Sequence, residues 1–173
     1  MTDTTTNLDQ ERADLLETLS KHRQLFRFTV EGLTDEQAAQ TPTASELCIG
    51  GLIKHVAFVE SGWTDFIVQG TAALEGGGEG DYLEHTNSFR MLPGETLAGI
   101  LEQYDKVAAR TDDLVRSLPD LSASHALPEA PWFEPGARWS ARRAFVHIVA
   151  ETAQHAGHAD ILRETIDGQK SMG

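Results

Sequence analysis

Glu151 and His155 are the first pair of side chains in this sequence whose types and spacing could bind a metal. They stand four residues apart in a segment whose apolar residues recur every three or four positions, so both fall near one face of a helix. A carboxylate that faces a core needs a cation, a donor network or a metal, because desolvation otherwise neutralises it. An imidazole and a carboxylate can both reach one ion at about 2 Å, as zinc and nickel prefer.

His55 is the candidate for a third ligand. It lies in an apolar stretch, Leu52–Phe58, on the flank of the stripe that a second helix would turn toward the core. Three protein ligands with open positions are typical of a catalytic metal site, because the remaining positions are free for water or substrate. The spacing of His55, Glu151 and His155 is compatible with two interpretations. One is a metal site; the other is ordinary hydrogen-bonded core histidines with a Glu–His pair on the helix surface.

Further polar residues flank the two candidate ligands of the last helical segment. His147 precedes Glu151 by four residues and His158 follows His155 by three, so we expect both at the rim or in hydrogen bonds to the ligands. Arg163 offers a bidentate fork that could bind a substrate carboxylate, and a surface salt bridge is the alternative. Three other histidines are expected at the surface: His22, His85 and His125.

Four segments with helical periodicity must position these side chains. The periodicity predicts helices at about 8–31, 45–69, 95–118 and 139–166. Gly, Pro and polar clusters separate them without strand-like alternation. We therefore expect an all-α fold, a four-helix bundle in one domain over residues 1–173, with long loops after the second helix (71–93) and the third (119–138). The first loop is long enough to be a candidate lid or rim of a site, with a surface connection as the alternative.

Some residues outside the candidate ligands also carry an expectation. Gly50 and Gly51 fall in the first turns of the second helix. Glycine there costs about 1 kcal/mol relative to alanine, so we expect the pair to mark a close contact with another helix. Aromatic residues of the two long loops could wall a substrate pocket: Tyr82, Trp132 and Phe133.

The charge and cysteine content narrow the class of partner. Lys and Arg number 14 against 27 Asp and Glu, a formal net charge of −13, which repels phosphate backbones and anionic membranes. Cys48 is the single cysteine, so no intramolecular disulfide can form. Neither a signal-peptide pattern nor an apolar run of about 20 residues is present. We expect a cytoplasmic protein that binds neither nucleic acid nor membranes.

The motifs together resemble a known family. The run His147–Glu164 (HIVAETAQHAGHADILRE), with Leu52–Val56 (LIKHV) and Ile166–Gly168, is similar to the DinB-like superfamily of four-helix metalloproteins over nearly the whole chain. It most resembles the actinobacterial branch related to mycothiol-dependent enzymes. Many members carry histidine where this chain has Glu151, and the glutamate resembles mycothiol-dependent maleylpyruvate isomerase. The resemblance implies a homodimer that uses a low-molecular-weight thiol.

The leading hypothesis is therefore a divalent-metal enzyme, with zinc expected and nickel as second choice, that activates a mycothiol-like thiol for S-transfer or isomerisation of a small molecule. The thiol must come from outside, because Cys48 lies seven residues before His55, roughly 10 Å along a helix. Two alternatives stay open. One is a metal-dependent hydrolase with His158 or His147 as proton relay; the other is a non-catalytic metal-binding stress-response protein.

Overall fold

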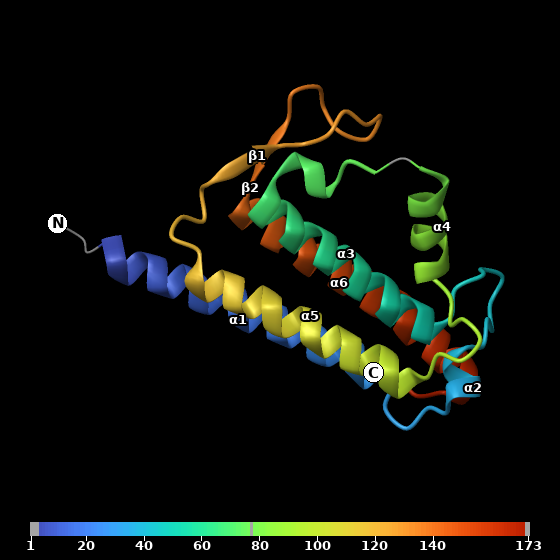
Figure 1. The fold of residues 1–173 in the computed structure, drawn as a ribbon. Helices are drawn as coiled ribbons and strands as arrows, with labels where there is room; N and C mark the ends of the chain where they lie inside the picture. The colour runs from blue at the N-terminus through green and yellow to red at the C-terminus, as the bar shows by residue number, and fades with distance from the viewer. Residues whose placement is uncertain (1–3, 77, 172–173) are drawn as a thin grey trace.

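Four long helices run side by side in the computed structural model, which describes residues 4–76 and 78–171, with side chains from Gln10 onward (Figure 1). The long helices are α1 (Thr4–Phe28), α3 (Ile49–Gln69), α5 (Leu97–Ser117) and α6 (Ala141–Asp167). Shorter elements join them: α2 (Asp35–Ala38), the 3-10 helix η1 (Thr71–Ala73), α4 (Glu79–Ser88), and strands β1 (Ser124–Ala126) and β2 (Arg138–Ser140). The expected all-α bundle is confirmed, with these additions.

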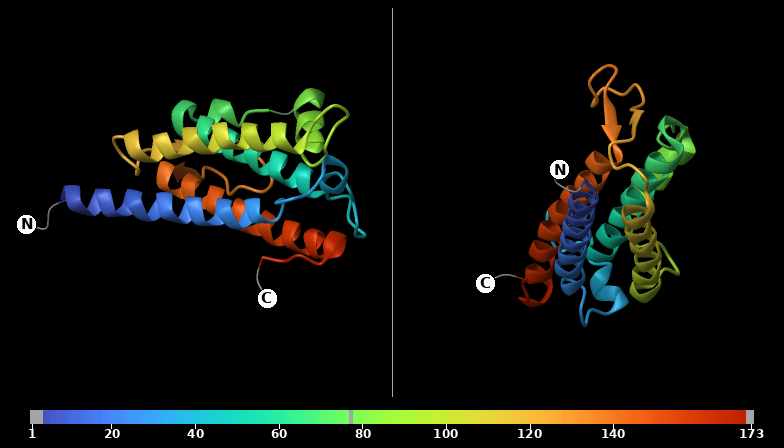
Figure 2. Two further views of the ribbon diagram at one scale, coloured as in Figure 1. Left: turned by 90° about the horizontal axis from the view of Figure 1, so that it is seen from below. Right: turned by 90° about the vertical axis from the view of Figure 1, so that its left-hand side faces the viewer.

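The direction of the helices explains the long connection before α5. α1 and α6 run one way and α3 and α5 run the other way, and α3 packs against both α5 and α6 (Figures 1 and 2). A 21-residue helix is about 31 Å long, so the chain must travel back over that length to start the parallel α5. Residues 70–96 make this return and contain η1 and α4. The loop expected over 71–93 therefore contains two short helical elements.

The second long connection also contains structure that the sequence pattern did not predict. Strands β1 and β2 pair antiparallel, with His125 opposite Trp139, and the hairpin projects from the bundle at the start of α6 (Figure 2). His125, expected at the surface, is half-buried, with its Nε2 3.3 Å from the carbonyl oxygen of Ile67. Among the described residues, no helix is long and apolar enough to cross a membrane.

Side-chain caps determine where the helices begin. The Ser140 hydroxyl accepts a hydrogen bond from the backbone N–H of Arg143, so α6 starts close to the predicted position. Helix α3 starts four residues later than predicted, at Ile49. The Ser45 amide donates to the Thr43 hydroxyl over 3.3 Å, and such local hydrogen bonds hold a chain in turns instead of a helix.

A buried polar layer divides the core of the bundle. Each long helix changes from one apolar cluster to the other in this layer, and α1 does so between Leu19 and Phe26. Arg23 of α1 donates to Glu60 of α3 over 2.5 Å, and the Thr111 hydroxyl of α5 donates to the same carboxylate oxygen. The layer therefore ties three helices together by charge-assisted hydrogen bonds.

Candidate metal centre

The three candidate ligands meet between α3 and α6. His55 comes from α3, and Glu151 and His155 stand one turn apart on α6. One ligand atom from each residue lies within 4.8 Å of the other two, and Glu151 Oε2 is 3.5 Å from His155 Nε2. Two ligands of a tetrahedral zinc site are about 3.4 Å apart, given bond lengths of about 2.1 Å. The cluster therefore has the spacing and the donor set to hold a divalent ion.

Burial of His55 and the hydrogen bond to Glu151 favour the protonation states in which these two side chains bind metals. His55 is 4 % exposed, and desolvation, followed by the neighbouring His155 and His85, lowers its pKa to about 4. A hydrogen bond from His155 and the positive character of nearby imidazoles hold the pKa of Glu151 below its usual value, against the opposing effect of burial. At neutral pH the site thus offers a neutral imidazole beside a carboxylate, which are the metal-binding forms.

The two flanking histidines lie beside the ligands. His147 Nε2 is 3.4 Å from Glu151 Oε1, and Trp63 and Trp139 pack edge-on against the His147 ring at 4.9 and 5.0 Å. On the other side, His158 Nδ1 is 3.4 Å from Nδ1 of His155. These contacts suit residues that orient a ligand from outside.

Residues in and just after α4 cover His55, and the sequence pattern did not place them beside this ligand. Phe89, just after α4, stacks on the His55 ring with centroids 3.7 Å apart, and the Ser88 hydroxyl lies 2.9 Å from His55 Nδ1. The ring of His85 is edge-on to His55 at 5.6 Å. Helix α4 has no apolar stripe to reveal these partners, and only the length of the 71–93 segment pointed to a functional role.

A close contact occurs at the two glycines of α3, as expected, but the partner is the segment that follows α4 and not another helix. A Cβ on Gly51 would lie 2.0 Å from the carbonyl oxygen of Phe89, and one on Gly50 would lie 2.2 Å from Sδ of Met91. Glycine at both positions lets the chain after α4 lie directly on α3. Two residues without side chains thus place Phe89 and Ser88 against a candidate ligand.

Comparison with known proteins identifies the family and the fold of the chain. The family model described as mycothiol S-transferase matches residues 14–168. The chain belongs to the mycothiol S-transferase family. This is a DinB-like family, as the sequence resemblance implied. A crystal structure of a conserved protein from Enterococcus faecalis has the same fold, with a TM-score of 0.66 and 15 % identity over 90 % of this chain and 96 % of that chain. No curated protein matches the chain significantly.

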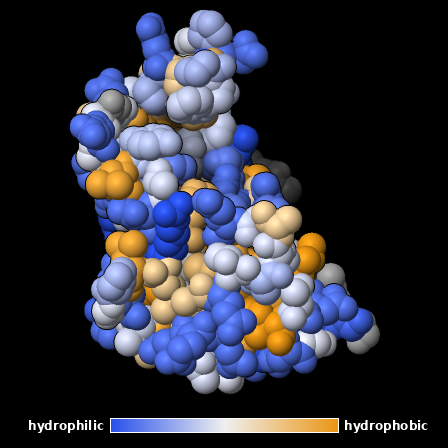
Figure 3. Space-filling view, turned by 90° about the vertical axis from the view of Figure 1, so that its right-hand side faces the viewer, coloured by the Kyte–Doolittle hydropathy of each residue, from blue (hydrophilic) through white to orange (hydrophobic). Residues whose placement is uncertain are grey.

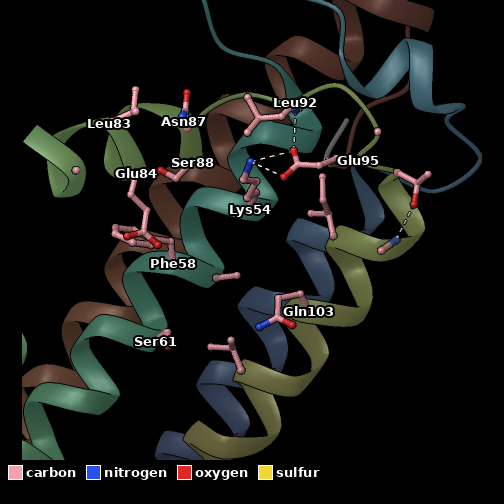
Figure 4. A pocket seen from close by; sticks show the side chains of 17 residues that line it. Lys54, Phe58, Ser61, Leu83, Glu84, Asn87, Ser88, Leu92, Glu95 and Gln103 are labelled. Atoms are coloured by element: carbon pink, nitrogen blue, oxygen red, sulfur yellow. Dashed lines mark hydrogen bonds and ion pairs between the residues drawn. The ribbon is translucent and has the colours of Figure 1, made fainter.

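A cavity of about 830 Å³ lies on the α5 side of α3 in this member of the mycothiol S-transferase family (Figure 4). Its wall is formed by α3, α4, α5 and the segment between α4 and α5, and it contains the Lys54–Glu95 ion pair of 2.7 Å. Ser88 lines this cavity and also contacts His55. The end of the molecule that carries α4 shows hydrophobic patches among mostly hydrophilic residues (Figure 3).

The aromatic loop residues do not form this wall. Tyr82 and Trp132 are 74 % and 77 % exposed, and Phe133 packs on Trp139 with ring centroids 5.9 Å apart. Other residues of α4 line the cavity instead, among them Leu83 and Asn87.

The side chain of Arg163 is fully engaged in hydrogen bonds within the protein. Its guanidinium is buried and donates to the carbonyl oxygens of Thr29 and Glu31 over 2.9 Å each, while its Nη2 pairs with Asp167 at 2.9 Å. Its remaining donors bind Asp167 and Gln169. Because these partners occupy the guanidinium, it ties the end of α1 to α6 and is not free for the substrate contact that the sequence suggested.

Proposed function

We propose that this chain is a divalent-metal-dependent S-transferase that joins a mycothiol-like thiol to an electrophilic small molecule, or isomerises such a compound through the thiol. The observation that carries the proposal is the convergence of His55, Glu151 and His155 on one point in a chain of the mycothiol S-transferase family. Open positions at a three-ligand site are suited to a reacting group. The same proposal includes a homodimer and a cytoplasmic location.

The chain's own residues would prepare the site for this chemistry. A divalent ion, zinc first and nickel second, supplies Lewis-acid chemistry that lowers the pKa of an incoming thiol. Glu151 contributes a negative charge that partly balances the ion, and His147 beside it holds the carboxylate in place. If His155 ligates through Nε2, its Nδ1–H donates to His158, which is half-buried at the rim and can pass a proton to solvent.

The environment of the single cysteine supports an external thiol. Cys48 is 3 % exposed, and its Sγ accepts a hydrogen bond from the Gly51 amide while facing the carbonyl oxygen of Phe89 at 3.8 Å. A thiol that caps a helix in this way is not available as a nucleophile. The reacting sulfur must therefore belong to a second substrate.

Metal content is the first test. Elemental analysis of freshly purified protein should find one zinc or nickel ion per chain in wild type and none in His155→Ala. His22→Ala is the matched control, because His22 lies on α1 outside the cluster, and it should keep the ion. Absence of metal from wild type after reconstitution would refute the site.

Turnover then separates the reaction classes. Purified, zinc-loaded protein is incubated with mycothiol and monobromobimane, and the thioether is quantified by chromatography. We expect a rate of conjugation above that of the uncatalysed reaction without protein, and we expect this excess to require both the ion and the thiol. Ester hydrolysis that is unchanged without thiol would overturn transfer in favour of a hydrolase. One ion per chain with loss of stability on chelation, and no turnover of any pair, would overturn it in favour of a non-catalytic metal-binding protein.

A further inference from the structure

Ser88 makes two hydrogen bonds that can be assigned from proton counting. The residue ends α4 and is 3 % exposed. Its Oγ lies 2.6 Å from the carbonyl oxygen of His85 and 2.9 Å from Nδ1 of His55. A carbonyl oxygen can only accept, and a serine hydroxyl has one proton to donate. That proton therefore goes to His85, and Ser88 Oγ accepts from a proton on His55 Nδ1.

We propose that Ser88 is a positioning residue that fixes His55 as the Nδ1–H tautomer and leaves the Nε2 lone pair to ligate the metal. The proposal rests on the proposed function, since it concerns the geometry of one ligand of that site. The alternative assignment, with the Ser88 proton on Nδ1, would place two oxygen lone pairs against each other at 2.6 Å. That arrangement is repulsive in a buried position.

The plane of the imidazole is fixed by other contacts. Phe89 stacks on one face of His55 at an interplanar angle of 21°, and the ring of His155 stands edge-on at 5.0 Å. Stacking holds the plane of the ring but does not decide which nitrogen faces the cluster, because a 180° flip keeps the same plane. The hydrogen bond to Ser88 makes that choice, since only a nitrogen carrying a proton can donate to Oγ.

Each candidate ligand then has a partner on its outer side. His147 contacts Glu151, His158 contacts His155, and Ser88 contacts His55. The first two partners come from α6 itself, whereas Ser88 comes from the connection between α3 and α5. Loss of an outer partner typically costs 10- to 100-fold in metal affinity, and we expect a loss in that range for Ser88→Ala.

The first experiment reads the tautomer in metal-free protein. Nitrogen-15 NMR of histidine-labelled wild type, with the His55 signals assigned through His55→Gln, should show a protonated Nδ1 and an unprotonated Nε2 at neutral pH. An Nε2–H tautomer in wild type would overturn the proposal without need of any variant. Because no ion is added, a protein that shows the expected tautomer but later binds no metal supports the role of Ser88 and refutes the metal site separately.

The second experiment measures zinc affinity by competition with a chromogenic chelator. Ser88→Ala should lose 10- to 100-fold in affinity, and Ser88→Thr should recover most of it, since threonine keeps the hydroxyl and the adjacent cavity has room for its methyl group. Ser61→Ala, which alters another serine on the wall of the same cavity, should bind like wild type. Wild-type affinity in Ser88→Ala, or equal losses in Ser88→Ala and Ser88→Thr, would overturn the proposal.

Discussion

Replacement of Gly51 by alanine tests how closely the chain after α4 is held against α3. The added Cβ would lie 2.0 Å from the Phe89 carbonyl oxygen, 2.3 Å from its carbonyl carbon and 2.8 Å from the Arg90 nitrogen. Ordinary van der Waals contact starts at 3.4 Å, so the Phe89 carbonyl must retreat by about 1.4 Å. The obstacle is backbone, so no side-chain rotation can remove it.

Two opposing effects set the size of the change. Alanine is better than glycine inside a helix by about 1 kcal/mol. Overpacking costs about 1–3 kcal/mol, and a backbone obstacle places Gly51→Ala at the upper end of that range. We therefore expect a net loss of about 2 kcal/mol in the free energy of unfolding, or a Tm lower by about 4–8 °C for a chain of this size.

Gly62 provides the matched control on the same helix. A Cβ there would meet no atom within 4 Å, so Gly62→Ala should gain about 1 kcal/mol and raise Tm by about 2–4 °C. Thermal unfolding followed by circular dichroism would compare the two variants with wild type. If Gly51→Ala gains stability as Gly62→Ala does, the inferred close contact between α3 and the end of α4 is refuted.

Gly51→Ala should also lower the affinity of the metal site for zinc. Phe89 stacks on His55 and follows Ser88 directly, so a displaced Phe89 carbonyl loosens both contacts to that imidazole. We expect Gly51→Ala to lose about tenfold in zinc affinity, comparable to loss of an outer partner, and Gly62→Ala to keep wild-type affinity. Zinc titration against a competing chelator measures both affinities. Equal zinc affinities in Gly51→Ala and Gly62→Ala would show that the position of the segment after α4 does not affect the metal site.

Two further predictions concern ion pairs away from the site. Glu60→Leu leaves Arg23 buried with only Asp112 as a charged partner, so it should cost about 3 kcal/mol, against about 1 kcal/mol for the more exposed Asp112→Ala. Urea unfolding measures the loss of unfolding free energy in both variants, and equal losses would contradict the importance of burial for this ion pair. A hydrogen bond from Arg142 lowers the pKa of Glu11 from 4.5, so this pair stabilises the fold above about pH 4.5 and less as pH falls through the lowered pKa. The stability difference between wild type and Glu11→Gln should therefore shrink as the pH falls through the lowered pKa, and a difference independent of pH would show that the pair does not act through charge.

The sequence pattern was sufficient for the long helices because their burial is periodic. On α6, Phe145, Ile148, Thr152 and Ala159 fall on one face and are all buried, which is the pattern that predicted the helix. The start of α3 was less predictable because residues 43–47 satisfy their backbone groups through serine and threonine side chains, and these compete with helix formation without changing the apolar pattern.

The three candidate ligands differ in how far the sequence could specify them. Glu151 and His155 are neighbours by helix geometry alone, so their proximity follows from a spacing of four residues. His55 joins them because α3 packs against α6, and that pairing depends on the order of helices around the bundle. An apolar stripe shows that a helix has a buried face, but it does not say which neighbour the face meets. The position of His55 on the flank of an apolar stripe made it a candidate, and the family resemblance of its motif supported that choice, but the packing of α3 on α6 came from the structure.

The partners from α4 were beyond sequence reasoning for a different physical reason. Most residues of α4 are exposed, so its sequence carries no periodic signal, and it is held against α3 mainly through the segment that follows it. The sequence evidence for this contact lies in α3, where Gly50 and Gly51 lack side chains. Two glycines indicate that another part of the chain packs closely there, but they do not identify which part. A parallel α3 and α5 require a return connection about one helix long, and in this chain that connection places Ser88 and Phe89 against His55. The outer contacts of His55 therefore depend on helix direction and on the path of the connection, and hydrophobic periodicity encodes neither.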